Sequence, residues 1–522
     1  MKKIYYIFAA MLLSLTLSSC GEEWLNVQSR DKILIDEYYN SEARIKEALV
    51  AAYDPLQWFD WGMGMYNPVP MIYEVMADDV YPGGSGVSDN RHYHLMFDYS
   101  VDSQNTPASV WTIAYSGVNR SNNVIKYMPG VQNISDASKA EMLAEATVLR
   151  TWYYTQMWKL WGNIPYYETN LDFPYECPQL KADEVYEAMV ASLEAAIDTK
   201  ALPMKRTAEL GRVTQAAAMM LYAEIVMYQN DKARMQKALD YMEEIITSGQ
   251  YALVSSADLA NMWEPAGEWS SETILDINFF SQGAYRSWGS PLAAGGTVLP
   301  TLMGMNSMSG SAKYGNEGWG FFPLTASAPK AFEEGDLRKA VTVYEPAKEA
   351  GVTYTARYQD TGFYNAKYLP RLDGNAGQIA DATLNYGTNI RLYRYSETLL
   401  NAAELIAVHG CAGKGSADAY LNEVRTRAGL GNVGANLESI LHERHVEFMG
   451  EGKRYWDLVR LGQASSVLTP ANDEGGYRTK AWTENKKYLP FPQSEMDATA
   501  STQYPLTQNN YYSLILKDYE DI

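Results

Sequence analysis

The sequence predicts a mostly α-helical protein made of tetratricopeptide-like helical hairpins, with long loop-rich insertions and a few short strands. Apolar residues recur every three or four positions over several segments, which is the period of an amphipathic helix. The segments between them are dense in glycine, proline and aromatic residues, a composition that does not form long helices. Because these two kinds of segment alternate along the chain, we expect one integrated domain at 35–522.

Five segments carry the helical period. In chain order they are residues 185–197, 212–229, 235–246, 392–406 and 417–428. The second of these is rich in alanine, which lets a neighbouring helix approach closely, and the third is followed by Gly249, a helix stop signal. Pairs of such helices predict hairpins that stack on one another, although no repeat of fixed length can be read from the sequence.

Loops are expected near 57–105, 261–330 and 345–390, and ligand-binding loops near the first two, because function tends to lie on loops held by a rigid scaffold. Five aromatic residues there have glycine-rich neighbours, which argues against deep packing between helices. They are Trp61, Tyr81, Trp288, Tyr314 and Trp319. These rings are the candidate binding surfaces, and packing in the core is the alternative for each of them.

The N-terminus has the features of a secretory signal peptide at 1–19. Lys2 and Lys3 precede an apolar run at Ile4–Leu17, which is too short to cross about 30 Å of hydrocarbon at about 1.5 Å per residue. Leu-Ser-Ser before Cys20 resembles a bacterial lipobox, which implies acylation of Cys20 and a lipidated tether at 20–34. The alternative is an ordinary signal peptide with an incidental cysteine.

Composition excludes one class of partner. The formal net charge is −20 at pH 7 and no basic tract compensates for it, so the chain would be repelled by nucleic acid. Cys177 and Cys411 lie far apart and in no CxxC spacing, which indicates neither a zinc site nor a redox motif. We expect them to be buried thiols, with a disulfide as the less favoured alternative.

No motif in the sequence indicates catalysis. His442 and His445 are three positions apart, whereas the HExxH zinc motif needs four. His92 and His94 could present two ligands on one strand face, but no third ligand is identifiable. No nucleophile elbow, P-loop or dinucleotide fingerprint occurs in usable context. We therefore expect no enzyme activity, no metal site and no cofactor, with calcium left open.

Six segments, in order, resemble the signatures of the RagB/SusD family of nutrient-uptake lipoproteins. They are WTIAYSGVNRSNNVI at 111–125, EATVLRTWYYTQMWKLWGNIP at 145–165, GRVTQAAAMMLYAEIVMY at 211–228, RYSETLLNAAE at 394–404 with LNEVRTRAGL at 421–430, LHERHVEFMGEGKRYWDLVRLG at 441–462, and YLPFPQSEM at 488–496 with QNNY at 508–511. The chain departs at His445, Leu461 and Asn510, where arginine, tryptophan and proline are common. None of these segments is itself a ligand site.

The resemblance implies a SusD-like fold and a lipoprotein of the cell outer membrane that binds a ligand rather than transforming it. It also implies a partner, a SusC-like TonB-dependent transporter on which the protein sits as a hinged lid. Gly21, Glu22 and Glu23 resemble a surface-export signal, which places the protein outside the membrane. The expected ligand is an oligosaccharide or small glycan. The alternatives are a peptide, as in RagB-like members, and an exported glycan hydrolase.

Two further predictions concern side-chain chemistry. A sugar ring stacks its apolar face on an aromatic ring while its hydroxyls take hydrogen bonds, and Asp78, Asp79 and Arg91 are the best polar candidates for this. In residues 443–460, charges of both signs alternate beside apolar residues. Buried charges need partners, so this segment predicts a salt-bridged helix junction rather than a catalytic site.

Overall fold

The computed structural model describes residues 38–315 and 318–512. The predicted signal peptide, the lipid tether and Cys20 therefore lie outside the described residues. Within the described part of the chain, no helix combines the length and the apolar character needed to cross a membrane.

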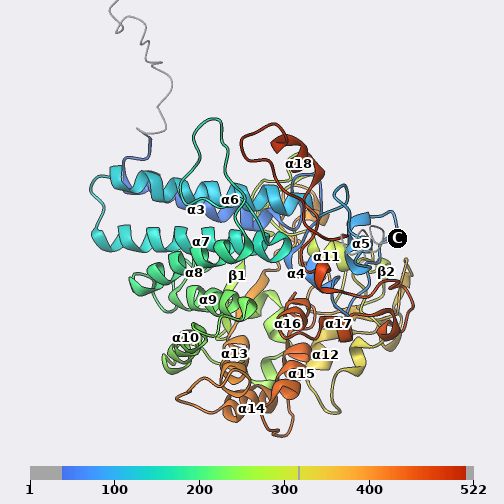
Figure 1. Cartoon of the computed structure of the whole chain (residues 1–522). Helices are drawn as coiled ribbons and strands as arrows, with labels where there is room; N and C mark the ends of the chain where they lie inside the picture. Colours follow the sequence, from blue (N-terminus) through green and yellow to red (C-terminus); the bar gives the residue numbers. More distant parts are fainter. Residues whose placement is uncertain (1–37, 316–317, 513–522) are drawn as a thin grey trace, which may run out of the picture.

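One half of the molecule is a stack of helices, each in contact with the next. In order they are α3 (Glu42–Tyr53), α6 (Ala108–Tyr127), α7 (Asp136–Trp161), α8 (Ala182–Asp198), α9 (Gln215–Gln229), α10 (Met235–Thr247), α13 (Tyr395–Ala407) and α14 (Ala417–Arg427). Figure 1 shows them as successive layers, from α3 and α6 at the top to α14 at the bottom. The prediction of a mostly α fold with stacked hairpins is confirmed.

Local sequence explains where these helices begin and how closely they pack. The Ser135 hydroxyl accepts a hydrogen bond from the Ser138 backbone N–H and caps the start of α7, as serine does at helix N-termini. Helix α9 ends at Asn230, which adopts the left-handed conformation with φ 58°. A Cβ at Gly117 would lie 2.3 Å from the Tyr153 ring, so the closest approach of α6 to α7 requires glycine there.

The remaining helices, all but α15 of seven residues or fewer, lie mostly among the loops on the other side of the molecule (Figure 1). They are α4 (Val69–Glu74), α5 (Arg91–Phe97), α11 (Leu299–Met303), α12 (Arg338–Thr342), α15 (Leu437–Phe448), α16 (Arg454–Arg460), α17 (Ala464–Val467) and α18 (Gln493–Thr499). Among the described residues the strands form three two-stranded antiparallel sheets. They pair β1 (Thr273–Ile277) with β6 (Ile390–Arg394), β2 (Asn306–Ser309) with β4 (Thr353–Thr355), and β3 (Val343–Tyr344) with β5 (Tyr364–Asn365).

One element boundary differs from the prediction. The apolar stripe expected to be helical from residue 392 begins in strand β6, and helix α13 starts only at Tyr395. The reason is tertiary, because β6 pairs with β1 and keeps the backbone extended through Arg394 (φ −128°, ψ 154°). The Tyr395 backbone N–H then donates to the Glu272 carbonyl, which closes the step from strand to helix.

A single hydrophobic cluster runs through helical and loop segments alike, from Ile45 near the start of the described chain to Tyr511 near its end. Cys177 and Cys411 are separate free thiols, so the disulfide alternative is wrong. We predicted that both thiols would be buried, but both are only half-buried, because they lie in connections between helices.

The predicted salt-bridged junction is confirmed, and its centre is Arg394. This buried guanidinium contacts three carboxylates, Glu272 at 3.0 Å, Glu447 at 3.0 Å and Glu451 at 2.8 Å. Arg427 pairs with two of the same acids, Glu447 at 2.6 Å and Glu272 at 2.9 Å. Burial alone would raise the pKa of Glu447, but the surrounding arginines, Arg427 first, hold it well below its usual value. The network joins β6, α14 and α15.

We expect Arg394→Ala to lower the free energy of unfolding by about 3–5 kcal/mol, because it leaves buried carboxylates without their partner. The matched control is Arg44→Ala, which removes an exposed pair with Glu47 and should leave the free energy of unfolding nearly unchanged. Chemical denaturation of both variants measures the difference. Equal, small losses would contradict the structural role of the junction.

Candidate ligand-binding site

Trp61 and Tyr66 flank a tight hairpin turn. Gly62 and Met65 exchange both backbone hydrogen bonds at 3.2 Å, and the two central residues have positive φ angles, 51° at Met63 and 79° at Gly64. Turns of this kind match the twist of a hairpin. The next residues outward, Trp61 and Tyr66, face each other across the hairpin on one side. Their rings stack with centroids 6.0 Å apart at an interplanar angle of 22°.

Two further tryptophans complete a closed group that we call the aromatic quartet, Trp61, Tyr66, Trp288 and Trp319. The Trp288 ring lies 4.8 Å from Trp61, edge to face, and stacks on Trp319 at 6.0 Å. Trp319 in turn meets Tyr66 edge to face at 5.5 Å. Trp288 is 46 % exposed, Tyr66 and Trp319 are partly exposed and Trp61 is buried, so the quartet is anchored in the protein and presents part of its rings at the surface.

A buried ion pair holds the quartet's loops together. Arg286 contacts Asp60 at 2.7 Å, and it also donates to the backbone carbonyls of Trp61 and Gly296. The Asp60 carboxylate accepts from the Trp61 N–H at 2.6 Å and from the Val298 N–H at 2.8 Å. Since this carboxylate and guanidinium satisfy each other and four backbone groups, the loops at 60–61 and 286–298 form one rigid unit.

Trp319 is positioned by the backbone around α11. Its N–H donates to the Thr301 carbonyl at 2.8 Å. A Cβ at Gly318 would lie 2.0 Å from the carbonyl carbon of Gly304, so the two chains approach this closely only because glycine is present. Trp288 is also tied through its backbone, because its N–H donates to the Asp381 carboxylate at 3.0 Å.

Of the residues predicted from sequence, the structure brings Trp61, Trp288 and Trp319 together. Tyr66 belongs with them but was not among the candidates. The signal that identifies it is the turn Gly62-Met63-Gly64-Met65, which predicts a hairpin with Trp61 and Tyr66 opposite each other. The role of these residues in binding stays a prediction.

Tyr81 and Tyr314 are not part of this group, and the expectation that glycine-rich neighbours leave their rings accessible is wrong. Tyr81 is 1 % exposed and its hydroxyl donates to the Asp473 carboxylate at 2.5 Å. Tyr314 is buried edge to face against Tyr344, with centroids 4.7 Å apart. In both cases a loop distant in sequence closes over the ring, which local glycine content does not reveal.

The polar candidates predicted from the sequence also lie outside the aromatic quartet. Asp78 accepts two hydrogen bonds from the Arg454 guanidinium at 3.0 Å each, and Asp79 contacts the His445 ring at 2.8 Å. Burial alone would raise the pKa of Asp78, but the Arg454 charge lowers it to about 2. Both acids therefore hold their loop against α15 and α16 and do not face a ligand. Arg91 is exposed at the start of α5 and remains accessible to a ligand.

Among the described residues, one group has the donor types of a metal site. Ligand atoms of Asp78, Asp79 and His445 lie within 4.8 Å of one another. The Arg454 guanidinium, however, already occupies the Asp78 carboxylate and adds a positive charge that opposes a cation. The chemistry of the group is that of an ion-pair cluster.

The pair His92 and His94 lies in helix α5 and not on a strand, so the possibility that both present ligands on one strand face, which was not the favoured interpretation, is removed. Side chains two positions apart on a helix diverge. The His92 ring is buried and contacts the Tyr66 carbonyl at 3.3 Å, and burial lowers its pKa to about 4.

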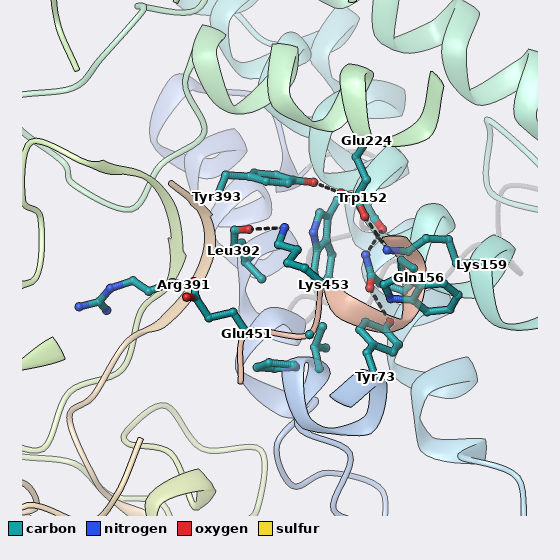
Figure 2. Close-up of a pocket in the computed structure, with 14 residues that line it drawn as sticks. Tyr73, Trp152, Gln156, Lys159, Glu224, Arg391, Leu392, Tyr393, Glu451 and Lys453 are labelled. Atoms are coloured by element: carbon teal, nitrogen blue, oxygen red, sulfur yellow. Dashed lines mark hydrogen bonds and ion pairs between the residues drawn. The ribbon is translucent and has the colours of Figure 1, made fainter. Parts of the chain in front are cut away.

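A small pocket at the helix junction has too little room for a sugar ring. Figure 2 shows it between Tyr73, Lys159, Glu224 and Lys453. Its free volume is about 40 Å³, room for a few water molecules. Lys159 donates to Glu224 at 2.5 Å, and although burial would raise the pKa of Glu224, the Lys159 charge lowers it to about 2. This is an internal ion pair and not a ligand site.

A larger groove of about 550 Å³ lies along α15 and the start of α16. Its lining includes Leu437, Leu441, His442 and Arg454 but no Trp, Tyr or Phe ring. It therefore lacks a surface on which a sugar could stack, and the aromatic quartet remains the candidate site.

Stacked helical hairpins that carry a rigid aromatic surface on their loops define a ligand-binding scaffold. Two family models match the chain, one described as the SusD family over residues 341–512 and one described as "Starch-binding associating with outer membrane" over residues 23–227. The chain belongs to the SusD family.

Similar solved structures share the whole fold. Surface glycan-binding protein A from Bacteroides thetaiotaomicron, in complex with laminarihexaose, is 46% identical, with a TM-score of 0.85 over 90% of this chain and 100% of that chain. A laminarin binding SusD-like protein is 26% identical, with a TM-score of 0.79 over 91% and 100%. Among curated proteins, SusD-like protein P25 from Formosa agariphila is 24% identical over 94% of each chain.

Proposed function

We propose that this protein captures an oligosaccharide on the aromatic quartet at the cell surface and delivers it to a SusC-like TonB-dependent transporter, without catalysing a reaction. The observation that carries the proposal is the quartet itself, four rings from three loops, two of which are tied together by the buried Arg286–Asp60 pair while the third is tied by the Trp319 backbone to Thr301. A rigid aromatic surface suits a sugar, because the apolar face of a pyranose stacks on an aromatic ring without the ring having to be ordered first.

The proposed ligand is a β-glucan of the laminarin type. Support comes from the relative solved with laminarihexaose, which matches this chain over 90% of its length at 46% identity, and from the relative described as laminarin binding. A peptide would instead pair its backbone with a free strand edge, whereas the quartet offers ring faces. Nothing in the site favours hydrolysis, so laminarihexaose incubated with the pure protein should remain intact.

We expect Trp288→Ala and Trp319→Ala each to weaken binding of laminarihexaose by about 1–3 kcal/mol, by analogy with base–aromatic stacking. This corresponds to about a 5- to 150-fold loss of affinity. Isothermal titration calorimetry on variants with unchanged circular dichroism measures it. The matched control is Phe173→Ala, which removes an 85 % exposed ring on the connection between α7 and α8. Unchanged affinity in both tryptophan variants would overturn the assignment of the site.

Cys20 is proposed as the lipid anchor, on the basis of the Leu-Ser-Ser-Cys context and the short apolar run before it. Cys20→Ala should release the protein into soluble fractions or stall its processing, because the acyl chains that hold it are lost. Membrane fractionation with N-terminal sequencing distinguishes the outcomes. A processed variant that stays in the membrane would contradict the lipoprotein assignment.

The transporter is proposed from membership of the SusD family. Purification from native membranes in mild detergent should recover a TonB-dependent β-barrel transporter together with this protein. The control is the same purification from cells that express Trp288→Ala, which changes the ligand site and should leave the complex intact. Recovery of this protein alone in several detergents would argue against the complex.

A further inference from the structure

A second group of aromatic rings lies at the surface outside the quartet. Tyr358 and Tyr477, which we call the tyrosine pair, meet edge to face with centroids 6.0 Å apart. Tyr477 is 39 % exposed and Tyr358 is half-buried. Neither hydroxyl has a hydrogen-bond partner in the described part of the chain, so both are available to a ligand.

The tyrosine pair is held rigidly by Tyr81, the buried residue that the sequence placed among the binding candidates. The Tyr81 ring contacts Tyr477 edge to face at 5.0 Å. Its hydroxyl donates to the Asp473 carboxylate at 2.5 Å and accepts from the Gly475 N–H at 3.0 Å. The second oxygen of Asp473 accepts from the Arg478 N–H at 2.6 Å. These contacts fix both ends of the short loop that carries Tyr477.

Backbone pairing connects the tyrosine pair to the quartet. The Tyr358 N–H donates to the Gly84 carbonyl at 3.1 Å, and the Gly84 N–H donates to the Gly320 carbonyl at 2.9 Å. Gly320 directly follows Trp319 of the quartet. The Tyr358 backbone is therefore tied through Gly84 to the residue that follows Trp319. Because the tyrosine pair and the quartet are separate groups of rings, a ligand that contacts both must extend beyond the quartet.

Arg357 lies between the two groups of rings. A Cβ at Gly320 would lie 3.0 Å from the Arg357 side chain, so its methylenes pass directly over the residue that follows Trp319. Within the described residues Arg357 forms no ion pair and is only partly buried. A guanidinium with free N–H groups beside aromatic rings is a suitable donor to sugar hydroxyls.

We infer that the tyrosine pair and Arg357 form a second subsite for the same glycan, occupied only by chains long enough to extend beyond the quartet. The inference rests on the proposed function and adds that the protein selects its ligand by length. Exposure of the rings is not by itself evidence for a second subsite, since Phe173 is more exposed than Tyr477. What distinguishes the tyrosine pair is its fixed support and its backbone connection to Trp319.

The test compares laminaritriose with laminarihexaose by isothermal titration calorimetry. Tyr358→Ala and Tyr477→Ala should each weaken binding of laminarihexaose by about tenfold, within the range for loss of one stacking ring, and leave laminaritriose unchanged. Tyr477→Phe keeps the ring and should retain most of the affinity. Trp288→Ala should weaken binding of both sugars, because both occupy the quartet.

The outcomes separate this inference from the proposed function. If Trp288→Ala loses affinity while both tyrosine-to-alanine variants bind laminarihexaose as tightly as the wild type, the second subsite is overturned and the quartet stands. Equal losses for the two sugars in the tyrosine variants also overturn it. If the wild type binds neither sugar, the proposed β-glucan ligand is overturned together with the inference that rests on it.

Discussion

The buried ion-pair junction around Arg394 is the interaction on which the rest of the structure depends. It joins a strand and two late helices, and Asp78–Arg454 and Asp79–His445 hold the loop that follows α4 against α15 and α16. Buried charges of this kind are costly unless each finds its partner, so removal of one member destabilises the fold. Residues 80–84 then run from this anchor alongside residues 320–324, where Val80 pairs with Leu324 and Gly83 with Phe321. Through these backbone pairs the junction therefore also helps to position Trp319.

The stacking of a ligand on the aromatic quartet is favoured because the protein holds the rings rigidly. Each ring contact contributes little, but the Arg286–Asp60 pair and the backbone ties at Trp288 and Trp319 order the rings before any ligand arrives. If the tyrosine pair acts as inferred, the second contact is made within an already bound chain, which raises affinity without a stronger first site. The net charge of −20 does not oppose an uncharged glycan, whereas it would repel a polyanion.

Several residues singled out by sequence are used for support instead of ligand contact. The buried Tyr81 ring packs against Tyr477 and supports it, and the contacts of Asp78 and Asp79 hold their own loop in place. His445, which departs from the pattern of the family, is the partner of Asp79. Such residues resemble binding residues in sequence because both kinds are polar or aromatic side chains on glycine-rich loops. The two kinds of residue differ only in whether other segments of the chain cover their side chains.

The sequence by itself determined the later helices of the stack, since apolar residues at helical spacing need only a neighbouring apolar face, as in α8, α9, α10 and α14. It also determined that the segment 443–460 is a salt-bridged junction and that aromatic residues gather on two loop regions. Tertiary structure decided the rest. Strand β6 replaced the first turn expected of α13, because β1, far away in the chain, supplies its hydrogen bonds. The quartet assembles from three loops, and which of the predicted rings are exposed depends on contacts such as Tyr314 with Tyr344. Burial is set by partners distant in the sequence, and local composition contains no information about them.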